Sequence, residues 1–140
     1  MPVLELKSVS KSYGSDDAKT RVLKDVSLAV EDGEFVAIVG FSGSGKTTLI
    51  GLMAGLTAPD SGEVLFRGQP VKEPGPERGV VFQSYSLMPW LSAQDNVRLA
   101  VDAVFAANPG RERKERVRHY IDMVGLSHAA DRKPAELSGG

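Results

Sequence analysis

Residues 35–48 constrain the fold more than any other stretch, because an apolar run there leads directly into a glycine-rich segment. Residues 35–39 read Phe-Val-Ala-Ile-Val, a length and a β-branched content typical of a strand buried on both faces of a parallel sheet. Gly40 follows, and after four further residues come Gly45, Lys46 and Thr47, the spacing of a phosphate-binding P-loop. A strand, this loop and a helix in that order predict an α/β fold with a polyphosphate site at the start of the helix.

The residue types of the loop explain how it would hold phosphate. Glycine at 40, 43 and 45 allows the backbone N–H groups to turn toward one anion. Lys46 would reach the β- and γ-phosphates, Thr47 would ligate Mg²⁺ through its hydroxyl, and Thr48 would add a phosphate contact. Charge-assisted hydrogen bonds contribute about 1.5–3 kcal/mol each, against about 0.3–1 kcal/mol for a helix dipole. The amides and Lys46 should therefore dominate affinity. A glycine-rich turn without a ligand is the alternative, and the flanking strand and helix disfavour it.

Composition bounds the class of protein. The 140 residues suffice for one ordinary core, and the net charge of −1 offers no basic excess for nucleic acid or an anionic membrane surface. Because there is no cysteine, disulfides and thiolate metal sites are excluded, which suits a reducing cytoplasm. No stretch of the sequence reads as a membrane span or a secretion signal, so attachment to a membrane would need a partner.

The remaining pattern changes from strands to helices near Ser84. Two antiparallel strands forming a β-meander are expected ahead of the P-loop, and breakers at 69–79 predict a loop. The expected strands beyond residues 35–39 are 3–9, 22–30, 63–66 and 79–83, and the expected helices are 46–56, 92–104 (capped by Ser92) and 111–124. We therefore divide the chain into a nucleotide-binding α/β and β part, 1–83, and a helical part, 84–140.

Tyr13 and Gln83 each admit two interpretations from the residues alone. The Tyr13 ring either packs in a turn or stacks on a nucleotide base, since every base offers a π-face. Gln83 either caps its strand or, because ligands sit at the carboxyl ends of parallel strands, holds Mg²⁺ or a water near the γ-phosphate.

With these residues in view, the sequence resembles the ATP-binding subunits of ABC transporters along all 140 residues. Tyr13 matches the family's adenine-stacking aromatic, residues 40–48 its Walker A loop, Gln83 its Q-loop, and the final Leu-Ser-Gly-Gly its signature motif. Residues 81–92 are similar to the nitrate, sulfonate and taurine importers. Residues 99–105, 128–131 and 134–140 are most similar to the nitrate type. The resemblance implies a P-loop NTPase with an N-terminal antiparallel β-subdomain, an incomplete parallel core sheet and an α-helical subdomain.

The resemblance also assigns the candidate site. It implies ATP and Mg²⁺ as cofactors, with Lys46 and Gln83 as catalytic residues and Thr47 and Gln83 as metal ligands. The residues that would contact the nucleotide are Tyr13, Gly40, Phe41, Ser42, Gly43, Ser44, Gly45, Lys46, Thr47, Thr48 and, from a second subunit, Ser138, Gly139 and Gly140.

The implied function is that of the ATP-hydrolysing motor of an importer, energising uptake of a small anion, nitrate first and sulfonate or taurine next. Two such subunits would sandwich two ATP molecules and act on membrane permeases through residues 84–91, which begin at Ser84, end at Leu91 and include Trp90, the one tryptophan. The subunit would be cytoplasmic and peripheral on the inner face of the cell membrane.

Part of the family's machinery is missing from the sequence. The Walker B strand with its Mg²⁺-binding Asp and catalytic Glu, and the switch His, do not occur in it. We therefore expect the N-terminal portion of a longer subunit, nearly inactive and poorly soluble alone. The alternatives are a soluble ABC ATPase outside transport, a non-catalytic nucleotide-binding fragment, and a small-molecule P-loop kinase, which the Leu-Ser-Gly-Gly motif disfavours.

Overall fold

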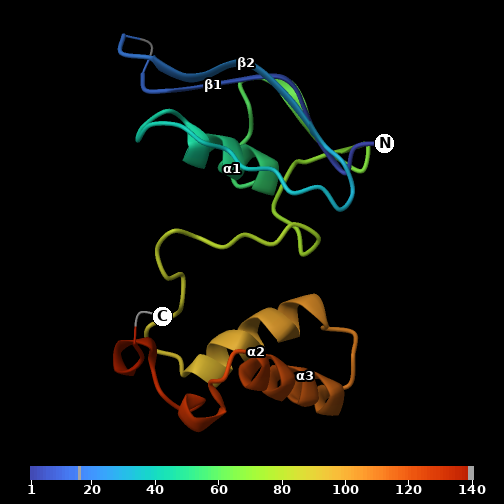
Figure 1. Cartoon of the computed structure of the whole chain (residues 1–140), viewed down its shortest axis with the longest axis vertical. Helices are drawn as coiled ribbons and strands as arrows, with labels where there is room; N and C mark the ends of the chain where they lie inside the picture. The colour runs from blue at the N-terminus through green and yellow to red at the C-terminus, as the bar shows by residue number, and fades with distance from the viewer. Residues whose placement is uncertain (16, 139–140) are drawn as a thin grey trace. The chain divides into compact units, whose positions relative to one another are not determined.

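A computed structural model describes residues 1–15 and 17–138 (Figure 1). The chain divides into two units, which we call the sheet unit, Met1–Val80, and the helical unit, Val81–Gly140. The division lies close to the boundary at 83/84 expected from the sequence, and each unit is described by itself.

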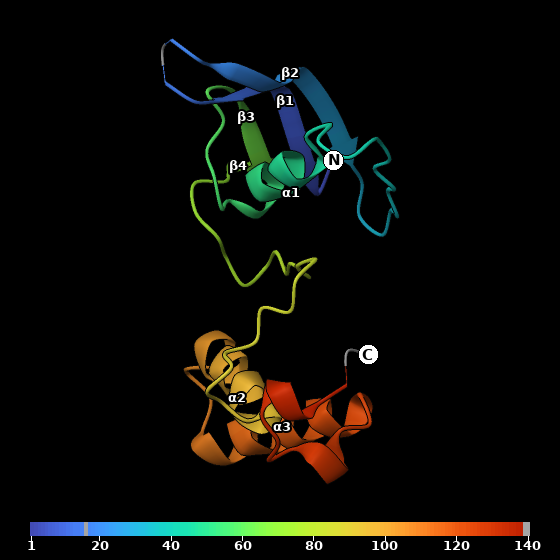
Figure 2. The same ribbon diagram turned by 90° about the vertical axis from the view of Figure 1, so that its left-hand side faces the viewer.

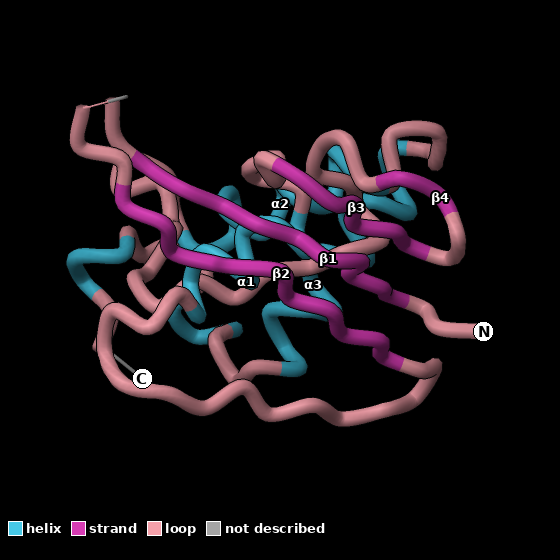
Figure 3. The backbone as a smooth tube through the Cα atoms, turned by 90° about the horizontal axis from the view of Figure 1, so that it is seen from above, coloured by secondary structure: helices cyan, strands magenta, loops and turns pink. Residues whose placement is uncertain are grey.

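The sheet unit contains, among its described residues, one antiparallel sheet whose strand order is β2-β1-β3-β4 (Figure 3). Its strands are β1 (Leu4–Tyr13), β2 (Thr20–Val30), β3 (Ser61–Phe66) and the short β4 (Gln69–Pro70). The three longer strands overlap those expected at 3–9, 22–30 and 63–66, which confirms the predicted antiparallel subdomain. The consecutive strands β1 and β2 pair as an antiparallel hairpin, in which Tyr13 is paired with Thr20 next to the connecting loop.

Helix α1 (Lys46–Ala54) covers one face of this sheet and forms the core with it (Figure 2). The buried contacts are apolar, and they join Leu49 and Leu52 of the helix to Leu6, Val9, Leu23 and Val64 of the sheet. The predicted start at Lys46 is confirmed, and Gly55 ends the helix with a φ of 78°. Leu56, the last residue of the expected helix, is 52% exposed, because the helix has ended before it.

The two expected parallel strands are not formed, and this part of the prediction is wrong. Residues 35–39 and 79–83 have no strand conformation, and Phe35, Val39 and Val81 are 94%, 89% and 100% exposed. A central parallel strand exists only when neighbours hydrogen-bond to both its edges and cover both its faces. No described segment pairs with either stretch, so their apolar composition alone does not make them strands.

The helical unit is built on two packed helices, α2 (Ala93–Val104) and α3 (Gly110–Met123). Their core consists of Val101, Val117 and Ile121, with Val97 and Phe105 packed against it. The Ser92 hydroxyl accepts a hydrogen bond from the Asp95 N–H at 3.1 Å, which confirms Ser92 as the cap of α2. Short 3₁₀ turns at Ser127–Ala129 and Pro134–Glu136 follow.

Candidate functional site

The glycine-rich loop is curled into the start of α1. Gly45 is the N-cap, with φ 98°, and its carbonyl accepts the first helical hydrogen bond, from the Leu49 N–H at 2.9 Å. A methyl group added at Gly45 would lie 3.0 Å from Leu23 Cδ2 and 3.1 Å from Val22 Cγ1. Consecutive side chains reach the same point because a shift in the β1–β2 register inserts Val22 between the paired residues Arg21 and Leu23. The strand pairing therefore positions the loop.

Lys46 lies inside this loop. Its ammonium donates to the carbonyl oxygens of Gly40 and Phe41, both at 2.7 Å, and to Ser44 Oγ at 3.2 Å. An ammonium has three donors, so these three oxygens match its capacity. The positive charge is thereby held over the concave side of the loop, where a phosphate would have to lie to meet it.

Gly40 lies close to the side chains of Ser44 and Lys46. A methyl group at Gly40 would lie 2.7 Å from Ser44 Oγ and 3.8 Å from Lys46 Nζ. The remaining loop residues Phe41, Ser42 and Gly43 are exposed, and Thr47 and Thr48 occupy the first turn of α1, with Thr47 exposed and Thr48 half-buried. Thr47 therefore presents a hydroxyl at the helix start, beside Lys46.

Tyr13 is the last residue of β1, 46% exposed, and it pairs with Thr20. Thr20 precedes Val22 by two residues, about 7 Å along the strand. Because Val22 contacts Gly45, the Tyr13 end of the hairpin and the P-loop lie at the same end of the sheet unit, at the left in Figure 1. The structure thus brings together the aromatic and phosphate-loop residues that the sequence named separately.

The other named residues belong to the helical unit. Gln83 is exposed in a bend and not at the end of a strand, because the strand expected at 79–83 is not formed. Ser138 is exposed near the end of the chain. Gly139 and Gly140 lie outside the described residues.

The residues present fit a polyphosphate. A curled loop at a helix N-terminus, a glycine N-cap and an ammonium held by three oxygens of the loop form a site that phosphate oxygens can complete. For a metal, residues 1–15 and 17–138 contain no cluster of three His, Asp or Glu side chains. The hydroxyl of Thr47 is the protein oxygen at this helix start that suits Mg²⁺, which typically keeps several waters and uses phosphate oxygens as ligands.

Comparison with known proteins decides the family. Residues 23–140 match the family model described as ABC transporter. The chain belongs to the ABC transporter family. The resemblance based on Tyr13, the Walker A loop, Gln83 and the signature motif is thereby confirmed.

Relatives in this family include import proteins for small anions. The nitrate import ATP-binding protein NrtD of Synechococcus elongatus is 44% identical over 137 residues, which cover 98% of this chain and 50% of the relative. The bicarbonate transport ATP-binding protein CmpC of Synechocystis is 47% identical over 126 residues, covering 90% of this chain and 19% of the relative. The predicted similarity to nitrate-type ATP-binding subunits is confirmed.

A solved ABC cassette has the same fold. The dimeric post-hydrolysis state of the ATP-binding cassette MJ0796, bound to ADP and Pi, has a TM-score of 0.82 and 34% identity, covering 97% of this chain and 63% of that one. This confirms the predicted α/β P-loop NTPase fold class, apart from the parallel core strands that are not formed among the described residues. The chain spans about half or less of the curated relatives' length and under two thirds of the solved cassette.

No helix within the described part of the chain is long and apolar enough to cross a lipid bilayer.

Two polar residues bind the backbone of candidate contact segments, namely the end of β1 and the loop that contains Trp90. Neither residue was identified from the sequence. Asp60 lies immediately before β3 and contacts the end of β1, and Asn96 of α2 binds the backbone of the loop that contains Trp90. An Asp in a Pro-Asp-Ser-Gly turn and an Asn after a capping Ser are common local patterns. Nothing in these patterns shows which backbone groups outside the turn or the cap the two side chains bind.

Proposed function

We propose that this chain is the N-terminal, nucleotide-binding portion of the ATP-hydrolysing motor subunit of an ABC importer for a small oxyanion. The observation that carries the proposal is Lys46, whose ammonium is held by Gly40 O, Phe41 O and Ser44 Oγ at the start of α1. The relatives named for nitrate and bicarbonate import support the transport role over a soluble ABC ATPase or a free-standing fragment.

Each loop residue has a role in binding ATP under this proposal. The amides from Gly40 to Thr48 surround the phosphates, and Lys46 exchanges its loop oxygens for those of the β- and γ-phosphates. Thr47 ligates Mg²⁺, which neutralises charge on the phosphates. Gln83 holds Mg²⁺ or orients the attacking water, and Tyr13 stacks on the base.

The complete reaction needs more than these residues. The resemblance assigns the remaining Mg²⁺ ligand and the general base to carboxylates that this sequence does not contain. We therefore infer that the 140 residues bind ATP weakly and turn it over slowly, and that hydrolysis belongs to a longer subunit.

Two partners follow from the proposal. A second ATP-binding subunit contributes Ser138, Gly139 and Gly140 to the γ-phosphate of the first, so that ATP closes a dimer. A membrane permease contacts residues 84–91, where Tyr85 and Trp90 are 78% and 66% exposed. Exposed aromatic side chains of this kind are enriched at protein interfaces. The motor would then be cytoplasmic and held at the inner face of the membrane by the permease.

The transported ion is a small oxyanion. Nitrate remains the first choice, and bicarbonate joins it because relatives named for nitrate and for bicarbonate transport have similar identity to this chain. Sulfonate or taurine is the next choice. Uptake of isotope-labelled nitrate, bicarbonate and taurine, compared between cells carrying the wild-type and the Lys46→Ala subunit, identifies the ion as the one whose import is lost.

Calorimetry of ATP binding to the intact subunit tests the proposal. Lys46→Ala removes charge-assisted hydrogen bonds of about 1.5–3 kcal/mol each, so ATP affinity should fall at least about tenfold. Lys24→Ala is the matched control, because Lys24 is an exposed lysine of β2. Undiminished affinity in Lys46→Ala, or an equal loss in the control, rules the ATP site out.

Trp90→Ala tests the permease contact. In the assembled transporter it should reduce anion uptake while ATP binding to the subunit stays unchanged. In the wild-type protein, Trp90 fluorescence should change when the permease is added. Normal uptake together with unchanged fluorescence would remove residues 84–91 from the interface.

A further inference from the structure

The end of strand β1, just before Tyr13, is held by one carboxylate. Ser10 is the last residue of β1 that pairs with β3, so residues 11–13 have β2 on one side and no strand on the other among the described residues. Asp60, the residue before β3, occupies this open side.

Asp60 makes three contacts with β1. Its backbone N–H donates to Ser10 O at 2.9 Å, Oδ2 accepts from the Ser12 N–H at 2.7 Å, and Oδ1 accepts from Lys11 Nζ at 3.3 Å. Its backbone and carboxylate therefore supply the hydrogen bonds that a continued β3 would make. The strand stays extended up to the residue that carries the candidate base-stacking ring.

The same carboxylate orients Lys11 toward that ring. The Lys11 ammonium lies 5.4 Å from the centroid of the Tyr13 ring and 3.3 Å from Asp60 Oδ1. The Lys11 side chain is only 15% exposed, whereas Tyr13 is 46% exposed. A cation within about 6 Å of an aromatic face is attracted to it. Lys11 therefore occupies one side of the ring, and a planar group approaching from solvent has the other side.

We propose that Asp60 is a positioning residue for the purine base of the nucleotide: it fixes the end of β1 and places Lys11 against one face of Tyr13, so that the base stacks on the opposite face. The proposal rests on the stacking role given to Tyr13 above. It adds that the orientation of the ring depends on a residue far away in the sequence, in the turn that leads into β3.

A comparison of two ligands separates the contribution of the base to binding affinity from the contribution of the phosphates. ATP carries a base, whereas inorganic tripolyphosphate offers only phosphates to the P-loop. In the intact subunit, Asp60→Ala should weaken ATP about three- to tenfold, a part of the loss expected from complete removal of one stacking contact. Tripolyphosphate affinity should be unchanged, which also shows that the variant retains a folded loop. Asp32→Ala, an exposed acid in a loop, is the matched control and should change neither affinity.

Asp60→Asn gives a graded test. The amide oxygen of the substituted side chain accepts from the Ser12 N–H as before, but the neutral amide cannot form the ion pair with Lys11. The ATP affinity of this variant should therefore lie between those of the wild type and Asp60→Ala. An unchanged affinity in both variants overturns the proposal.

A double-mutant cycle with Tyr13→Leu distinguishes the positioning role of Asp60 from the stacking role of Tyr13. If Asp60 acts through the ring, Asp60→Ala should have no further effect on ATP affinity once Tyr13 is replaced by Leu. Additive losses, or a loss of tripolyphosphate affinity in Asp60→Ala, overturn the positioning role and leave the stacking role intact. If Tyr13→Leu alone leaves ATP affinity unchanged, the stacking role in the proposed function fails, and the positioning role fails with it.

Discussion

Gly45 and Lys46 are adjacent in the sequence, yet different neighbours constrain them. Gly45 adopts a φ of 98° and lies against Val22 and Leu23, so both its backbone angle and its lack of a side chain are needed. Lys46 is constrained by oxygens of its own loop. The motif thus combines packing against β2 with the arrangement of Lys46 that we propose for binding phosphate.

Gly45→Ala should destabilise the sheet unit by about 1–3 kcal/mol, through the unfavourable φ and the added methyl group 3.0 Å from Leu23 Cδ2. Urea unfolding of the intact subunit measures this change. Gly79→Ala is the control, because nothing lies within 4 Å of a methyl group there and its φ is ordinary. Equal stability of the two variants would show that the loop does not pack against β2.

Asp60 should make stability depend on pH in the acid range. The N–H donated by Ser12 holds the pKa of the Asp60 carboxyl below its usual range; Lys11 and Lys19 lower it further, and burial opposes them in part. Because the folded-state pKa is the lower one, the stabilisation is complete above the unfolded-state pKa near about 4. It is lost as pH falls through the folded-state value.

The difference in unfolding free energy between wild type and Asp60→Asn, followed from about pH 7 down to about pH 2, measures this effect. It should be constant at neutral pH and shrink below about pH 4. A difference that grows on acidification would contradict the lowered pKa.

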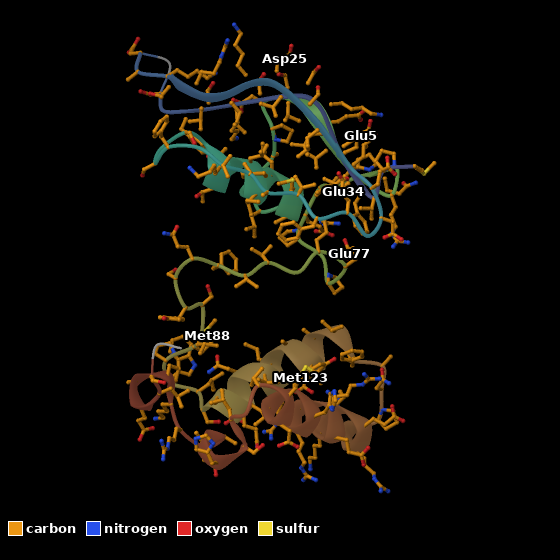
Figure 4. The ribbon with its side chains drawn as sticks, in the orientation of Figure 1. Glu5, Asp25, Glu34, Glu77, Met88 and Met123 are labelled. Atoms are coloured by element: carbon orange, nitrogen blue, oxygen red, sulfur yellow. The ribbon has the colours of Figure 1, made fainter. Side chains whose placement is uncertain are left out.

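At the scale of elements, the side-chain amide of Asn96 hydrogen-bonds to the backbone of the loop that precedes α2. Asn96 Oδ1 accepts from the Met88 N–H at 2.8 Å, and Nδ2 lies within hydrogen-bond distance of Met88 O, Leu91 O and Ser92 O, at 3.2, 3.3 and 3.0 Å. Met88, labelled in Figure 4, lies two residues before Trp90. The exposed segment 84–91, which we propose as the permease contact, is therefore held in place by Asn96 of α2.

Asn96→Ala should destabilise the helical unit by about 1–3 kcal/mol, since it leaves half-buried backbone groups of the loop without their partners. Unfolding followed by Trp90 fluorescence reports the loop, and unfolding followed by circular dichroism reports the helices. Leu99→Ala, at a position of α2 that is 54% exposed, should stay within about 0.5 kcal/mol of wild type. No loss in Asn96→Ala would mean that other contacts hold the loop.

At the scale of the whole molecule, most of the apolar side chains ahead of the P-loop and at the start of the helical unit are uncovered, although Ile38 packs against the core of the sheet unit. Phe35, Val39 and Val81 are each at least 89% exposed. Monomeric proteins rarely expose contiguous apolar segments of this kind without a partner or an aggregation risk. These segments are the ones whose composition predicted central strands, so they are suited to burial between neighbouring strands.

A protein limited to the 140 residues should therefore self-associate, and Phe35→Ser with Val39→Thr should reduce the association. Sedimentation velocity across a range of concentrations measures both. Replacing Met123, which is 65% exposed on α3, with Ser is the control for an isolated apolar side chain. A monodisperse monomer at high concentration would show that the exposed segments are tolerated.

Local patterns in the sequence predicted the features that depend on near neighbours. The start of α1 at Lys46, the cap at Ser92 and the antiparallel hairpin were predicted from residues near one another in the sequence. The family followed from four motifs in order. These predictions were correct because capping, turns and loop geometry involve backbone groups that the sequence itself places together.

The sequence by itself thus determined the P-loop motif, the positions of the three helices, the antiparallel subdomain and membership of the ABC transporter family. Only the tertiary structure decided that Leu6 and Val9 share the buried face despite their odd spacing, that Gly45 packs on Val22 and Leu23, and that Asp60 holds the strand before Tyr13. It also decided that residues 35–39 and 79–83 are not strands. The physical reason is common to all four: each depends on hydrogen bonds and packing between segments distant in the sequence, and the composition of one segment does not specify its partner.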